Sequence, residues 1–321
     1  MTIRIVTTNK NSEFLYPIIQ NSLNQRNITI ELYNENQNYD SNVIFSIGNE
    51  IRDVAALEKF TSNRVIVEYQ GESNSGKHGS YFNPEAENIL YIYGCCKNSD
   101  ADNIIFYPNF FWHDLALDYL NRNYNQYKLK KTYSKKFLMP IRNWKGQAAW
   151  RREVFNQLVD IIPDAIYSMY EDGIYLPGSD RKSDRREINY AWFDDTHFSL
   201  TLESYYDHEK PIFPTEKIYK PIAFCHPFQV IASPGFLNYL KLNGFETFEN
   251  LFDESYDQIT DITEKIKILK KNVFEYRYEP YDTTTLQKLQ HNQQHFYNLD
   301  IILKGIETDF VEPVLHWINR S

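Results

Sequence analysis

Short apolar runs alternate with helical patterns along the first third of the chain. The runs are rich in Val, Ile and Tyr, which is typical of buried strands. Between them, apolar residues recur every three or four positions, as in an amphipathic helix. The predicted strands are Ile3–Thr7, Ile28–Tyr33, Val43–Ile47, Val65–Tyr69, Ile89–Tyr93 and Ile104–Tyr107, and the predicted helices are Ser12–Gln25 and Ile51–Phe60. This alternation predicts a mostly parallel sheet that is covered on both faces.

The same alternation restarts after a polar, basic stretch that follows a helix predicted over Asp114–Lys131. The later predicted strands are Phe137–Ile141, Ala165–Ser168, Phe198–Leu202 and Phe228–Ala232, and the helices are Gln147–Ile161, Thr215–Phe224, Phe236–Asn243, Ile259–Phe274 and Thr284–Trp317. We therefore predict an α/β fold of two Rossmann-like domains that face a cleft, residues 1–130 and 131–321, the second ending in helices. Ligands of such sheets bind beyond the carboxyl ends of the strands, where helix N-termini offer N–H groups to phosphates.

Composition narrows the classes of partner. Tyr 25, Phe 21 and Trp 5 make 16% of the 321 residues aromatic, which fits a large core or a surface that stacks on flat ligands. The net charge of -9 disfavours a general electrostatic grip on nucleic acid or an anionic membrane. Three cysteines form no disulfide framework or zinc signature, which predicts a reduced, cytoplasmic protein. No secretory leader and no apolar stretch of about 18–20 residues is present, so we expect no transmembrane segment.

Several short motifs carry weak signals. The segment Gly71–His78 approaches a phosphate-binding loop, but His78 replaces the hydroxyl residue and no helix pattern follows, so a mobile loop at the cleft fits better. Acidic pairs and His–carboxylate pairs are open to a metal-binding or acid–base interpretation, or to a structural one. These pairs are Asp100 with Asp102, Asp194 with Asp195, His113 with Asp114, and His197 with Asp195.

The segment Phe198–Gly235 is more informative. A strand ends at Glu203, a polar loop follows, and Thr215 is placed to cap the next helix. Glu216 and Lys217 then fall in the first helical turn. A lysine there opposes the helix dipole, and its presence is easier to explain if an anion binds at that end. Strand, loop and a Glu-Lys helix start together predict a nucleoside-diphosphate pocket.

This segment resembles the donor-binding motif of the alpha-(1,3)-fucosyltransferases and related GT-B glycosyltransferases. The family has a strand ending in Glu-Asn-Ser, a loop, and then an aromatic residue followed by x-Thr-Glu-Lys. The present chain has Glu203-Ser204 at the strand end and Phe213-Pro214-Thr215-Glu216-Lys217 after a loop about three residues longer. The resemblance implies that Glu216 holds the ribose, Lys217 the diphosphate, and that Phe213 packs on the base.

A second segment extends the resemblance over about Phe137–Asp257. The family has Arg-x-x-Phe on a helix after a strand, and its Arg grips the diphosphate. Arg152 takes that place here, Arg151 is an equally placed rival, and Arg142 lies at the strand end. The runs Thr215–Pro221 and Gly244–Asp257 look more like a bacterial and viral branch of fucosyltransferase-like proteins. On this resemblance, residues 1–130 are the acceptor side and 131–321 bind the nucleotide sugar.

The resemblance implies glycosyl transfer from a nucleotide sugar to a hydroxyl, and we expect the reaction to be inverting. Fixed cations and a helix N-terminus can stabilise the leaving diphosphate, so we expect neither a divalent metal nor another cofactor. An inverting enzyme also needs a base for the acceptor proton. Glu68 at a strand end, and Glu72 and His78 in the next loop, are the candidates.

The acceptor and the activity itself remain open at this stage. The first interpretation is a glycan acceptor, of the bacterial surface polysaccharide or lipopolysaccharide type. The second is a viral-type transferase acting on a hydroxymethylated DNA base, for which Arg181, Lys182, Arg185 and Arg186 form a local basic cluster. The negative net charge disfavours DNA. The third is a non-catalytic module that binds a nucleotide or a sugar.

Overall fold

The chain divides into two compact units, Met1–Asp118 with Leu299–Ser321, and Tyr119–Asn298. The computed structural model describes residues 3–7, 15–32, 44–47, 64–69, 89–94, 102–132, 134–142, 149–180, 186–204, 206, 212–277 and 279–320. The predicted helix Ile51–Phe60 and the loop Gly71–His78 lie outside these ranges.

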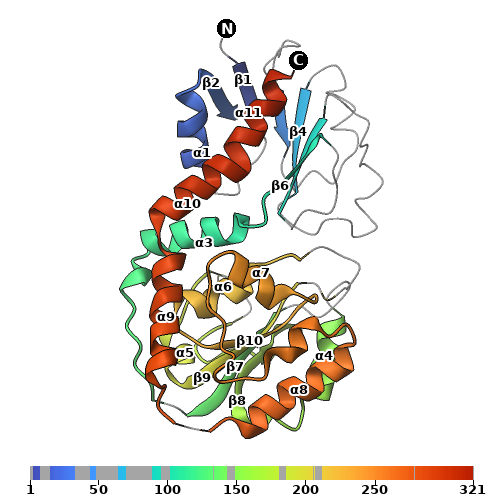
Figure 1. The fold of residues 1–321 in the computed structure, drawn as a ribbon, viewed down its shortest axis with the longest axis vertical. Helices are drawn as coiled ribbons and strands as arrows, with labels where there is room; N and C mark the ends of the chain where they lie inside the picture. Colours follow the sequence, from blue (N-terminus) through green and yellow to red (C-terminus); the bar gives the residue numbers. More distant parts are fainter. Residues whose placement is uncertain are drawn as a thin grey trace. The chain divides into compact units, whose positions relative to one another are not determined.

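The first unit contains a parallel six-stranded sheet in the order β2-β1-β3-β4-β5-β6. Its strands are β1 (Ile3–Thr7), β2 (Ile28–Leu32), β3 (Ile44–Ile47), β4 (Arg64–Tyr69), β5 (Ile89–Tyr93) and β6 (Ile104–Phe106). Helix α1 (Leu15–Asn24) connects β1 to β2 and packs against β2 (Figure 1). The six predicted strands of this part are therefore confirmed, with ends that differ by one residue at most.

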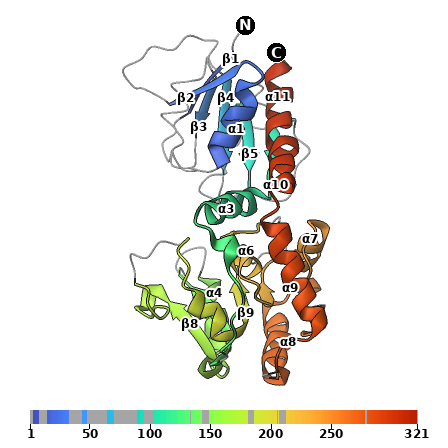
Figure 2. The same cartoon turned by 90° about the vertical axis from the view of Figure 1, so that its left-hand side faces the viewer.

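The last residues of the chain belong to this first unit. Helix α10 (Leu299–Ile306), a π-helical turn (Glu307–Val311) and α11 (Glu312–Asn319) lie beside α1 (Figure 2). The Glu307 carboxylate accepts hydrogen bonds from Ser22 and Arg26, which lie at the end of α1 and just after it. The prediction of one helix over Thr284–Trp317 within the second domain is therefore wrong. An amphipathic pattern predicts that one face of a helix is buried, but it does not predict which sheet that face packs against.

The second unit contains a parallel four-stranded sheet in the order β10-β9-β7-β8. Its strands are β7 (Lys135–Ile141), β8 (Ala165–Met169), β9 (Thr196–Leu202) and β10 (Phe228–Ile231), each confirming a predicted strand. Both units thus have parallel sheets with helical connections, which confirms the predicted α/β class. The cleft between them stays a prediction.

Helices connect and flank the second sheet (Figure 1). They are α4 (Trp150–Gln157), α5 (Tyr190–Asp194), α6 (Glu216–Ala223), α7 (Phe236–Leu242), α8 (Ile262–Glu275) and α9 (Thr283–Phe296). Helix α5 was not predicted, because five residues are too few to show helical periodicity.

The division between the units falls inside helix α3 (Phe110–Asn121). The sequence placed it near residue 130, after the helix. Tyr119 and Tyr127 instead pack their rings against Phe224 of the second unit, at centroid distances of 5.5 Å each. Tyr127 also donates a hydrogen bond to Asp194 at 2.6 Å. These contacts attach α3 and the basic stretch after it to α5 and to the end of α6.

Candidate functional site

The strand order of the second sheet creates a switch point between β7 and β9. From β7 the chain moves outward to β8, and it then returns to place β9 on the other side of β7. In open α/β sheets, ligands bind beyond the carboxyl ends of the two strands at such a point. Arg142 directly follows β7 and Glu203 directly follows β9. The topology therefore brings these two residues, 61 positions apart in sequence, to the place where a ligand is expected.

Helix α6 begins at the same edge. Thr215 is its N-cap, with an extended backbone (φ −126°, ψ 179°), and its hydroxyl accepts the Lys217 N–H at 3.4 Å. The predicted capping role of Thr215 is confirmed. Glu216 and Lys217 are the first two helical residues, so their backbone lies where helix N–H groups are not used by the helix itself.

The Glu203 carboxylate accepts hydrogen bonds from Thr215, the N-cap of α6. It is fully buried, and its Oε1 accepts the Thr215 N–H at 3.2 Å. Its Oε2 accepts the Ser204 N–H at 3.1 Å and the Thr215 hydroxyl at 2.5 Å. Burial raises the pKa of Glu203, while the Lys217 charge and the Thr215 hydrogen bonds oppose that shift. The structure thus places Glu203 as a support for the site and not on its open surface.

The Lys217 ammonium is held at the edge of the site by three oxygens. Its Nζ donates to the Thr215 hydroxyl at 2.9 Å, to Ser204 at 3.0 Å and to the Glu216 carboxylate at 3.4 Å. Burial would raise the pKa of Glu216, but the charges of Lys217 and Lys220 outweigh it and lower the pKa to about 2. A carboxylate with that pKa is ionised throughout the physiological range and can accept hydroxyl hydrogen bonds.

The three candidate arginines occupy different places. Arg142 lines the cavity described below, with its guanidinium 5.3 Å from the centre of the Tyr170 ring. Arg151 is 5% exposed and donates from Nε and Nη2 to the Glu203 carbonyl, at 3.0 and 2.6 Å. Arg152 forms an ion pair with Asp172. Of the three, Arg142 is the one that lines this cavity together with Lys217.

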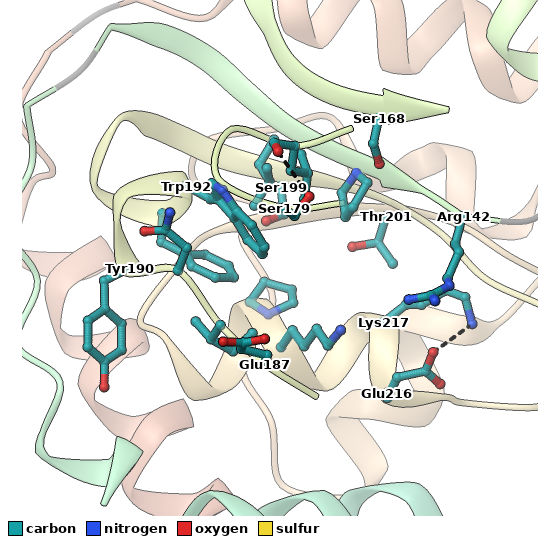
Figure 3. Close-up of a pocket in the computed structure, with 18 of the residues that line it drawn as sticks. Arg142, Ser168, Ser179, Glu187, Tyr190, Trp192, Ser199, Thr201, Glu216 and Lys217 are labelled. Atoms are coloured by element: carbon teal, nitrogen blue, oxygen red, sulfur yellow. Dashed lines mark hydrogen bonds and ion pairs between the residues drawn. The ribbon is translucent and has the colours of Figure 1, made fainter. Parts of the chain in front are cut away.

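A cavity of about 460 Å³ opens beside these residues (Figure 3). It runs along one face of the sheet, under α5, α6 and the segment that follows β8. Arg142, Glu216 and Lys217 lie on one side of it, and Trp192 and Ser199 on the other (Figure 3). Its size is within the range of small-molecule sites in proteins. Two of the predicted phosphate-binding residues, Arg142 and Lys217, therefore line a cavity that could hold a ligand.

Phe213 does not contribute to this cavity. It is 6% exposed, and it is absent from the described residues that line the space. The base-packing role that the resemblance gives to Phe213 thus has no counterpart in the geometry of the cavity.

Sequence reasoning missed other lining residues. Among them are Ser168, Glu187, Trp192, Ser199 and Thr201. One signal was available, because small hydroxyl residues alternate with large apolar ones in Phe198-Ser199-Leu200-Thr201-Leu202. All seven residues of β9 are buried, so a row of small polar side chains on one face indicates a cavity over that face.

The candidate bases lie in the first unit and are only partly described. Glu68 lies in β4, opposite Ile92 of β5 in the register, and its side chain is outside the described residues. Glu72 and His78 lie outside the described ranges altogether. The assignment of the base therefore stays a prediction, as does the basic cluster, of which Arg181, Lys182 and Arg185 are also outside.

The histidines of the two His–carboxylate pairs are buried in the protein core. His113 is 1% exposed, with Nδ1 at 2.6 Å from the Tyr107 hydroxyl. Its ring packs on Gly305 of α10 so closely that an added Cβ would come within 2.5 Å of it. His197 is fully buried between Tyr276 and Tyr281, and burial lowers its pKa to about 4. Buried neutral rings of this kind serve the fold.

The carboxylates of the acidic pair Asp194–Asp195 likewise accept hydrogen bonds from other residues of the protein. Asp194 accepts the Tyr127 hydroxyl and the Lys130 N–H, and Asp195 accepts the Thr132 hydroxyl. Within the described ranges, no three His, Cys, Asp or Glu side chains gather as ligands for a metal ion. None of the described helices combines the length and the apolar character needed to cross a membrane.

His113 provides a test of this interpretation by pH. Burial lowers its pKa to about 3, so between pH 6.5 and 3 the unfolded chain binds a proton that the folded protein does not. The free energy of unfolding should therefore fall as the pH falls through this window, by up to about 1.4 kcal/mol per pH unit from this group. We expect His113→Gln to show a shallower dependence between about pH 7 and pH 5 in urea denaturation. Equal slopes in the two proteins would contradict the buried neutral state.

The comparisons with known proteins concern the fold. Two crystal structures of alpha1,3-fucosyltransferase, one with GDP and one with GDP-fucose, match 94% of this chain with TM-scores of 0.48 and 0.46. The matches cover 92% and 90% of those chains, at 16% sequence identity. No protein-family model and no curated protein sequence matches the chain. At this identity and with both TM-scores below 0.5, the likeness leaves the activity, the donor and the acceptor of this chain open.

Proposed function

We propose that the chain is a glycosyltransferase, fucosyltransferase-like, that moves a sugar from a nucleotide sugar to a hydroxyl of an acceptor. The observation that carries the proposal is the cavity at the switch point, with Arg142 and Lys217 beside the N-terminus of α6. Two fixed cations and a helix N-terminus are the features that bind a diphosphate. The Glu216 carboxylate beside them suits a ribose hydroxyl.

The proposed reaction uses these residues on the leaving group. The acceptor oxygen forms a bond to the anomeric carbon while the bond from that carbon to the diphosphate oxygen breaks. The electron pair of the broken bond stays on the diphosphate, and the acceptor proton passes to a base, for which Glu68, Glu72 and His78 remain the candidates. Lys217 and Arg142 stabilise the charge that develops on the diphosphate. Because they are permanently placed cations, no divalent metal is required for this role.

The donor and acceptor follow as finer proposals. A GDP-sugar is the first donor to test, and the net charge of -9 favours a glycan hydroxyl over DNA as the acceptor. A surface polysaccharide or lipopolysaccharide is the proposed kind of glycan. We propose that the protein acts in the cytoplasm, because its three cysteines form no disulfide framework.

A thermal-shift panel of GDP, UDP, CDP, CMP and dTDP tests the proposal directly. A ligand that binds only the folded protein stabilises it by about 2.7 kcal/mol at 100 times its dissociation constant. We expect one base to stand out, because the few polar groups that line a pocket of this kind fix the orientation of the ligand and give specificity. The same nucleotide attached to a sugar should then be hydrolysed or transferred by the protein. Stabilisation without turnover would favour the non-catalytic module, and no stabilisation by any nucleotide would remove the proposal.

A further inference from the structure

One part of the cavity lies over β7 and β9, before the charged residues at the carboxyl end of the sheet. We define the inner chamber by Leu138, Pro140, Trp192, Phe193, Ser199 and Thr201. Ser199 lies four residues before Glu203 on β9, which corresponds to about 13 Å along the strand. The cations Arg142 and Lys217 are at the carboxyl end of the sheet, so the chamber extends inward from the phosphate-binding edge.

Thr201 is the unusual residue of this chamber. It is 5% exposed, and none of the described residues hydrogen-bonds its hydroxyl. Its neighbours are satisfied, since Ser199 is 2.8 Å from His226 Nδ1 and Ser168 bonds the backbone of Ile141. Figure 3 shows Thr201 between Ser168 and Lys217, with its side chain on the cavity side. Because Thr201 lines the cavity, a ligand or a water molecule that occupies the cavity can supply the partner of this hydroxyl.

The wall opposite Thr201 is aromatic and held in place. The Trp192 indole N–H donates to the Pro177 carbonyl at 2.8 Å, which fixes the orientation of the ring. The Tyr170 hydroxyl is 2.8 Å from the Ser179 hydroxyl, and this hydrogen bond connects two parts of the segment that follows β8. A rigid aromatic ring loses little conformational entropy when a flat ligand packs on it.

We infer that the inner chamber binds the nucleobase of the donor and that Thr201 hydrogen-bonds the nucleoside, a role that the resemblance assigned in part to Phe213. This inference rests on the proposed function. A sugar carries several hydroxyls, and the apolar walls formed by Leu138, Pro140 and Phe193 would leave most of them without partners. A base has apolar faces and a few polar edge atoms, which suits one hydroxyl and an aromatic wall. The transferred sugar must also stay open to the acceptor, whereas the base need not.

The test compares binding of nucleoside diphosphates with binding of inorganic pyrophosphate, measured by calorimetry. Thr201→Val keeps the shape of the side chain and removes its hydroxyl. We expect Thr201→Val to weaken binding of the best of GDP, UDP, CDP and dTDP by roughly tenfold, with pyrophosphate binding unchanged. Thr201→Ser should restore most of the affinity, and Trp192→Ala should weaken the nucleotide and spare pyrophosphate. Thermal melts without ligand check that each variant is folded.

The outcomes separate this inference from the proposed function. If the wild-type protein binds a nucleoside diphosphate and Thr201→Val binds it equally well, the inference fails and the proposed function stands. A loss limited to nucleotide sugars, with free nucleoside diphosphates unaffected, would place the sugar in the chamber and also overturn the inference. If the wild-type protein binds neither nucleotide nor pyrophosphate, both fail together.

Discussion

Lys217→Met should lower the rate of sugar transfer by about 10²- to 10³-fold, the largest effect that we expect from one substitution in the site. The ammonium is held by Thr215, Ser204 and Glu216 beside the N-terminus of α6, so its position is set before a ligand arrives. A charge fixed in advance stabilises a leaving diphosphate without reorganisation. Methionine keeps most of the volume of the side chain and removes the charge.

The measurement is turnover of whichever nucleotide sugar the panel selects, together with binding of its nucleoside diphosphate. Lys267→Met is the matched control, because Lys267 is exposed on α8 and pairs only locally with Glu264, three positions before it. We expect that control to act as the wild-type protein does. A second readout is independent of turnover, since the loss of the Lys217 charge should raise the pKa of Glu216 from about 2 toward its ordinary value. Full activity in Lys217→Met would remove Lys217 from the mechanism.

Glu203→Gln should lower the free energy of unfolding by about 2 to 3 kcal/mol, although the two side chains have the same shape. Each carboxylate oxygen accepts a backbone N–H, one from Thr215 and one from Ser204. A glutamine amide has a single acceptor oxygen. Either orientation of the substituted amide would therefore set an NH₂ group against a buried N–H.

Urea denaturation of the full chain measures this effect, and Glu264→Gln is the control, since it removes a carboxylate from an exposed pair on α8. That control should change stability by less than about 0.5 kcal/mol. Nucleotide binding by Glu203→Gln should weaken as well, because Glu203 holds the N-cap residue that positions Lys217. Unchanged stability in Glu203→Gln would show that the buried carboxylate is not the support that its hydrogen bonds indicate.

The candidate site was predictable in the parts that are contiguous in sequence. Thr215, Glu216 and Lys217 occupy one helix start, and a cap followed by a charged pair is a local pattern. The three arginines were not separable from sequence. Arg151 and Arg152 are neighbours, yet one is buried against the Glu203 carbonyl and the other pairs with Asp172. Which side of a helix faces the site depends on how the helix packs, and periodicity alone does not decide it.

The strands and most helices follow from the order of apolar and polar residues, because burial of both faces of a parallel strand requires a continuous apolar run. Patterns among residues close in sequence also predict the α/β class and the helix cap at Thr215. Tertiary structure alone decided that Leu299–Ser321 joins the first unit, that Arg142 and Lys217 line one cavity, and that Thr201 and Trp192 line it too. The physical reason is the range of the interactions. Helix caps and strand patterns involve neighbours along the chain, whereas packing and sheet order join residues that are distant in sequence and close only in the fold.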